Sequence, residues 1–134
     1  MEVHILGRNP VSEVGRVFHA SLREWAMLHE ATRMVCERLL APDLHEATRS
    51  RAGAGPREGL TCQQMAARLE RWMQGPHFAG TNKVLVWVGV ALACRKPAWP
   101  RSAAPEDLLR GRDVRPLVAA WVRFLNHCGG YAVW

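Results

Sequence analysis

The sequence predicts a single α+β domain, residues 1–134, that is mostly helical. Three observations support this prediction. The chain has 134 residues with 49% apolar and 22% charged residues, which is enough to build one hydrophobic core. Three long stretches carry apolar residues at helical spacing, and short apolar stretches at both ends are typical of strands. We therefore expect three main helices around a core rich in Trp and Val, with short strands at the termini.

The N-terminal stretch predicts a strand followed by a turn. Residues 2–6 alternate weakly between polar and apolar side chains and end at Gly7, as a short strand does. The pair Asn9-Pro10 is typical of a turn. Ser12 is then placed to cap a short helical turn that runs through Phe18.

The first main helix has a capping box at its start. The Ser21 side chain can accept a hydrogen bond from the backbone of Glu24, and the Glu24 side chain can reach back to Ser21. An apolar face that includes Trp25 follows, at helical spacing, to about Leu40. We expect Pro42 to end this helix.

A flexible basic loop is expected at about 47–59. The segment has three Gly, one Pro and no bulky apolar residue, so it cannot contribute to a core. It carries Arg49, Arg51 and Arg57. Connections of this length between helices are often functional or disordered.

The second main helix is expected to begin near residue 60. Thr61 and Gln64 have the spacing of a capping box, and Leu60 and Met65 are placed as the accompanying hydrophobic staple. We expect Gly75-Pro76 to end the helix.

Two segments in the second half are less regular. Residues 84–90 have Val at alternate positions, which favours a buried strand, whereas Asn82 and the length of the apolar run favour a buried helix. Both alternatives stay open, and strand is the one we prefer. Pro105 followed by two acidic residues predicts a short helix to Arg110.

The last main helix and the end of the chain form one pattern. Asp113 is placed as the cap, and apolar residues from Val114 to Cys128 form one face. Gly129 stands where a left-handed residue is needed to end a helix. Residues 130–134 predict a terminal strand that could pair with the first strand and bring the two ends together.

The stretch from Phe124 to Val133 resembles a loosely defined set of small, uncharacterised bacterial and phage-associated proteins. These proteins share a Trp-containing N-terminal helix, a helix entered through a Gly-Leu-Thr-like start, and a last helix followed by a Gly-Gly-aromatic strand. Trp25, residues 59–61 and residues 129–131 match these features. The resemblance implies a phage or mobile-element setting, in which small proteins often bind host machinery. It implies no activity and no catalytic residues.

The charge of the chain is carried by arginine and is unevenly distributed. Arg makes up 16 of the 18 basic residues; residues 1–48 have a net charge of −2, and residues 49–134 have a net charge of +8. The planar guanidinium group pairs well with carboxylates and phosphates, so an acidic protein surface or a nucleoprotein is the expected partner, with nucleic acid itself as the alternative. Ordinary solvated surface arginines would give the same balance. The candidate binding residues are Arg49, Arg51, Arg57, Arg95, Lys96, Trp99, Arg101, Arg110, Arg112 and Arg115.

The histidines and cysteines do not form a metal-binding or catalytic motif. No pair of His or Cys residues has the short spacing of a zinc site, so we expect no metal and no cofactor, and a site assembled from distant residues is the open alternative. We expect Cys36, Cys62 and Cys128 to be small buried side chains. A thiolate at Cys128 is disfavoured because this residue ends a helix, where the helix dipole is negative. No catalytic residue is predicted.

These features together predict a small non-enzymatic interaction protein. We expect it to be phage or mobile-element encoded and to bind a host protein or nucleoprotein complex, as in counter-defence or host takeover, through an arginine-rich face. Direct nucleic-acid binding and an enzyme with a dispersed His/Cys site are the alternatives. The sequence shows neither a signal peptide nor a membrane span, so we expect a cytoplasmic protein.

Overall fold

The computed structural model describes residues 2–76, residue 78 and residues 114–134, and it is an α+β fold in which helices predominate. The elements follow in the order β1 (Glu2–Gly7), a short 3-10 turn η1 (Glu13–Gly15), β2 (Val17–Ser21), α1 (Leu22–Val35), α2 (Pro42–Ser50), α3 (Gly59–Gln74), α6 (Arg115–His127) and β3 (Tyr131–Val133). The predicted elements at 84–93 and 105–110 lie outside the described residues, as does Cys94.

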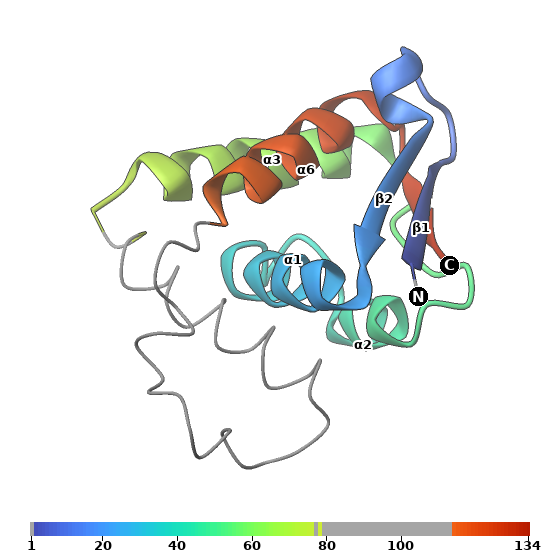
Figure 1. Ribbon diagram of the computed structural model, residues 1–134, viewed down its shortest axis with the longest axis horizontal. Coiled ribbons are helices and arrows are strands. Elements are labelled where there is room, and N and C mark those ends of the chain that lie inside the picture. Colours follow the sequence, from blue (N-terminus) through green and yellow to red (C-terminus); the bar gives the residue numbers. More distant parts are fainter. Residues whose placement is uncertain (1, 77, 79–113) are drawn as a thin grey trace, which may run out of the picture.

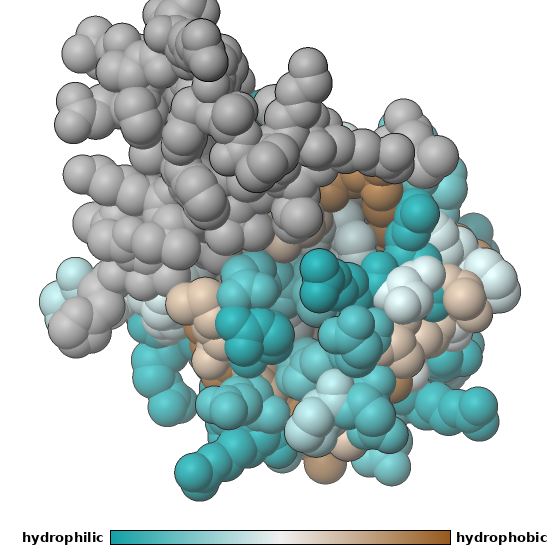
Figure 2. Space-filling view, turned by 90° about the horizontal axis from the view of Figure 1, so that it is seen from below, coloured by the Kyte–Doolittle hydropathy of each residue, from teal (hydrophilic) through white to brown (hydrophobic). Residues whose placement is uncertain are grey.

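The elements are arranged around one core (Figure 1). Helices α3 and α6 lie side by side and run in opposite directions, and α1 and α2 lie across the core from them. The small sheet closes one end of the molecule, where both chain ends are found. The face seen from below is mostly hydrophilic in its described part, with apolar residues scattered among polar ones (Figure 2).

The sheet has three antiparallel strands in the order β2-β1-β3. In register, Leu6 lies opposite Val17 on β2, and Ile5 lies opposite Val133 on β3. The expected pairing between the first and last strands is therefore confirmed. The prediction of a helical turn through Phe18 is wrong. Only Glu13–Gly15 is helical, and Val17–Ser21 forms strand β2, which pairs with β1.

Trp121 on α6 lies at the centre of the core and is fully buried. Its ring packs edge-on against Trp25 of α1 and Tyr131 of β3, with centroid distances of 5.6 and 5.2 Å. Its indole N–H donates to Thr32 Oγ1 at 3.2 Å, and that hydroxyl donates to the Leu28 carbonyl at 2.7 Å. Trp121 thus joins α1, α6 and the sheet, with its one polar group satisfied.

The capping box of α1 is present as predicted. Ser21 Oγ accepts from the Glu24 N–H at 3.0 Å, and Glu24 Oε1 accepts from the Ser21 N–H at 2.9 Å. The helix ends at Val35 instead of continuing to about Leu40. Pro42 begins α2 instead of ending α1, which is physically reasonable because the first residue of a helix needs no N–H donor.

The predicted loop at 47–59 is shorter than expected. Residues 47–50 are the last turn of α2. The chain then runs beside β3: the Gly53 N–H donates to the Val133 carbonyl at 2.8 Å, and the Tyr131 N–H donates to the Pro56 carbonyl at 2.9 Å. The small residues that suggested a loop instead allow this segment to lie close against a strand.

The side chain of Arg8, the residue after β1, also binds this segment. Its Nε donates to the Tyr131 carbonyl at 3.0 Å, and its Nη2 lies 3.3 Å from the carbonyls of both Gly53 and Gly55. One guanidinium group thereby connects the start of β3 to the segment that follows α2.

The start of α3 also differs from the expectation. The helix begins at Gly59, and its N-cap residue Glu58 makes no side-chain capping bond. Thr61 and Gln64 therefore do not form a capping box, because both already lie inside the helix. Leu60 is 64% exposed and does not act as a staple. The predicted end is confirmed, since Gly75 follows the last helical residue.

The predicted apolar face of the last helix, from Val114 to Cys128, is confirmed: its residues are buried, except that Leu117 is partly buried. Val114 occupies the N-cap position without a side-chain bond, and Asp113 lies outside the described residues. Gly129 has the expected left-handed conformation, with φ of +62°, and a Cβ there would lie 2.1 Å from the Asn9 carbonyl oxygen. Both facts require glycine at this turn.

Candidate functional site

Four of the ten predicted binding residues lie in the described part of the chain. Arg49 is exposed in the last turn of α2, and Arg51 is half-buried directly after it. Arg57 is exposed before α3, and Arg115 is the exposed first residue of α6. The other six, namely Arg95, Lys96, Trp99, Arg101, Arg110 and Arg112, lie outside the described residues.

The structure does not bring these four arginines into one patch. The Arg115 guanidinium lies 4.8 Å above the ring of Phe78, which packs against Trp72 near the end of α3. Arg57 lies just before the start of the same helix. A helix of 16 residues is about 24 Å long, so Arg57 and Arg115 are separated by most of the molecule.

Ion pairing divides the described arginines into two groups. Arg16 pairs with Glu13 at 3.3 Å, and Arg33 pairs with Glu30, which lowers the pKa of that carboxyl through a hydrogen bond. A second group is exposed and, within residues 2–76, 78 and 114–134, has neither a carboxylate within ion-pair distance nor carbonyl partners like those of Arg8: Arg38, Arg49, Arg57, Arg68, Arg71 and Arg123. This second group is available to an anionic partner.

Three of the unpaired arginines lie on the two packed helices α3 and α6. Arg68 and Arg71 are exposed on α3, and Arg123 is exposed on α6. We call these three residues the helix-pair arginines. The exposed residues Ala67 and Ala119 lie one turn before Arg71 and Arg123, so the neighbouring side chains on these helix faces are small.

The helix-pair arginines are not among the binding residues predicted from the sequence. Those predicted residues lie in loops and Pro-rich segments of the sequence, where basic residues cluster along the chain. Arg68, Arg71 and Arg123 are instead spread along two amphipathic helices. Their exposure can be predicted only from their position on the side of each helix opposite its apolar face.

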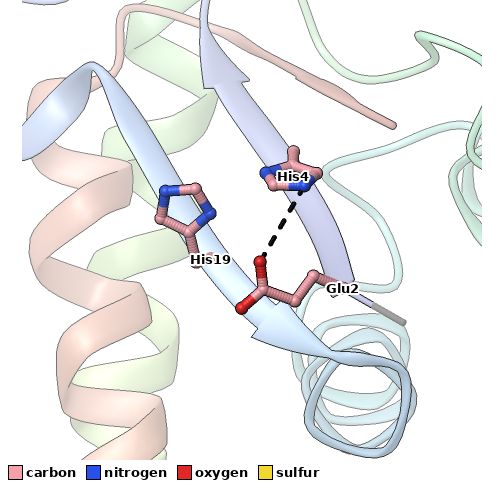
Figure 3. Close-up of side chains that lie close together, drawn as sticks. All are labelled: Glu2, His4 and His19. Atoms are coloured by element: carbon pink, nitrogen blue, oxygen red, sulfur yellow. Dashed lines mark ion pairs between the residues drawn. The ribbon is translucent and has the colours of Figure 1, made fainter.

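A second group of polar side chains gathers on the outer face of the sheet (Figure 3). Glu2 and His4 project from β1, and His19 projects from β2. All three are exposed, and one ligand atom of each lies within 4.8 Å of the others. No short-spacing motif reveals this group in the sequence, because His4 and His19 are 15 residues apart.

The hairpin register explains why the two histidines meet. Val3, Ile5 and Ala20 face the core, so the alternation of a strand turns His4 and His19 outward. They lie directly opposite each other, and their ring centroids are 4.9 Å apart. The Gly7 N–H donates to the Arg16 carbonyl three ladder positions away, which makes the histidines a non-hydrogen-bonded pair with closely spaced side chains.

The remaining exposed residues of this sheet face are mostly apolar. Leu6 and Val17, which lie opposite each other, are 43% and 40% exposed. Trp134 continues the line of β3, and its N–H donates to the His4 carbonyl at 2.7 Å. The histidine and glutamate cluster is therefore the polar part of an otherwise apolar sheet face.

The described cysteines lie inside the core, as expected from the sequence. Cys36, Cys62 and Cys128 are fully buried and are not joined by disulfides. Burial raises the pKa of Cys36 to about 12, and the interaction with Cys128, together with burial, raises the pKa of Cys62 well above its ordinary value. Thiols this deeply buried are poor nucleophiles because water and substrates do not reach them.

No described helix combines the length and the apolar character that crossing a membrane requires. The protein was also compared with known proteins. A scan against family models, a search of curated proteins and a search of solved structures found no match to this chain.

Proposed function

We propose that this chain is a non-enzymatic interaction protein that binds an acidic protein surface or nucleoprotein through exposed arginines. The observation that carries the proposal is the set of exposed arginines with neither a carboxylate partner nor a side-chain hydrogen bond, six of them among the described residues. An unpaired guanidinium on a helix is free to form bidentate bonds with a partner's carboxylates, at no cost of breaking an internal ion pair.

The distribution of charge supports the same proposal. Residues 49–76 and 114–134 hold seven arginines and two acidic residues, a net charge of +5, whereas residues 1–48 have a net charge of −2. Such an asymmetry favours the approach of an anionic surface to the elements of residues 49–76 and 114–134, α3 and α6 above all, over its approach to β1, β2 and α1. The resemblance to small phage-associated proteins makes a host protein, in a counter-defence or takeover setting, the partner that we propose. Its location would then be the host cytoplasm.

The proposal can be tested with two variants that remove the same charge. In Arg68→Gln/Arg71→Gln, two unpaired arginines are lost, whereas Arg16→Gln/Arg33→Gln removes two arginines that already pair with Glu13 and Glu30. We expect the first variant to lose most of the binding to an acidic partner, recovered by affinity capture from host lysate, and the second to retain it. Equal losses in both variants would mean that only net charge matters.

Direct nucleic-acid binding is the alternative, and salt dependence distinguishes it. Labelled single- and double-stranded oligonucleotides should be titrated at several salt concentrations, and the capture repeated after nuclease treatment. If the partner is a protein, its capture should be unchanged after nuclease treatment. If the oligonucleotides bind tightly, and log K falls with log salt by about 0.7–0.9 for each phosphate contact, the nucleic-acid alternative replaces our proposal.

A further inference from the structure

We propose that Glu2, His4 and His19 form a binding site for a divalent first-row transition metal, with Zn²⁺ as the representative ion. The proposal does not depend on the exposed arginines. Those residues would bind an anionic partner, whereas this site would bind a metal cation. It rests on two imidazoles and one carboxylate that the β1–β2 hairpin brings together on one exposed face.

The ligand types suit this class of metal. Zn²⁺, Ni²⁺ and Cu²⁺ bind imidazole nitrogen readily, and a carboxylate oxygen completes a common mixed set. Zinc bonds to His and Glu of about 2.0–2.2 Å place neighbouring ligand atoms about 3.3 Å apart in a tetrahedron. The three ligand atoms already lie within 4.8 Å of one another, and His4 Nε2 lies 4.0 Å from Glu2 Oε2.

The remaining adjustment is small and falls on side chains alone. Each ligand atom must move by about 1.5 Å or less to reach the bonding distance of Zn²⁺. Glu2, His4 and His19 are exposed, so rotation about their side-chain bonds meets little resistance. The backbone beneath them is held by the antiparallel ladder, which fixes the spacing of the two histidines.

Three protein ligands leave at least one coordination position open. On a solvent-facing sheet that position would hold water or a ligand atom from a bound molecule. The bound metal would also join β1 to β2, so it would stabilise the hairpin that begins the fold. Among the described residues, this group is the one whose ligand atoms converge in this way.

The test is calorimetric titration of the purified, tag-free chain with Zn²⁺. We expect saturable binding with one metal per chain, a rise in melting temperature on adding Zn²⁺, and at least a tenfold loss of affinity in both His4→Gln and His19→Gln. Glu2→Gln should lose less. His127→Gln is the matched control, because His127 lies on α6, bonds to Ser12 in the β1–β2 connection and is not one of the three converging ligands; it should bind Zn²⁺ as the parent does.

Co²⁺ spectroscopy identifies the ligands directly. Nitrogen and oxygen ligands give visible bands without the intense near-ultraviolet absorption of a cobalt–thiolate bond. Absence of saturable binding in the parent, unchanged affinity in both histidine variants, or a thiolate band would each overturn the proposal. The substituted side chains are exposed, so circular dichroism of the metal-free variants should match the parent and separate lost ligands from lost folding.

Discussion

Trp121 shows how one side chain can determine the stability of this core. It is fully buried and contacts the rings of Phe18, Trp25 and Tyr131. Trp121→Ala should therefore lower the free energy of unfolding by about 3–5 kcal/mol, the usual result of removing a large buried ring. Chemical denaturation measures the change. Trp134→Ala, at a residue that is 55% exposed, is the control and should cost much less; equal losses would contradict the placement of Trp121.

His45 gives the fold a dependence on pH. The side chain is buried, its Nε2 has no hydrogen-bond partner, and burial lowers its pKa below the ordinary value. Near pH 6.5 the unfolded chain therefore binds more protons at this residue than the folded chain does. Since protons then favour the unfolded chain, stability should fall as pH decreases from about 7 through 6. Denaturation at several pH values should show a shallower decrease for His45→Gln. An unchanged slope would assign the effect to other groups.

At the scale of elements, Arg8 makes a prediction about the segment after α2. Its guanidinium contacts the carbonyls of Tyr131, Gly53 and Gly55. Arg8→Gln removes these bonds, so the segment should open more often, and trypsin should cleave faster after Arg51 and Arg57. Mass spectrometry of a time course measures the rates. Arg16→Gln, which removes an exposed arginine of η1's ion pair, should leave them unchanged.

Local signals predicted some elements and failed for others. The capping box at Ser21 and the left-handed Gly129 are encoded within a few neighbouring residues, and both predictions are confirmed. Strand β2 has five residues, and its structure depends on pairing with β1, which lies elsewhere in the chain. Pro42 is compatible with ending one helix or beginning the next, and only packing decides between them.

At the scale of the whole molecule, the two candidate sites differ in how far sequence predicts them. The excess of arginine is a property of composition, so the basic half of the chain can be identified from the sequence. Which of these arginines have no ion-pair partner cannot be predicted in this way. The cluster of Glu2, His4 and His19 needs the register of a hairpin whose second strand was not predicted. A shift of one residue in that register would turn His19 toward the core.

The position of β1 in the sheet also affects how the protein is made. This strand leaves the ribosome before β2 and β3, and it is central, with β2 on one side and β3 on the other. Gly7 pairs with Tyr131, which is synthesised 124 residues later. At a synthesis rate of about 5–20 residues per second, one edge of β1 stays unpaired for roughly 6–25 s until β3 has been made. During translation the nascent chain thus exposes an unpaired strand edge, which is where a chaperone would bind and where two nascent chains on one messenger could pair wrongly.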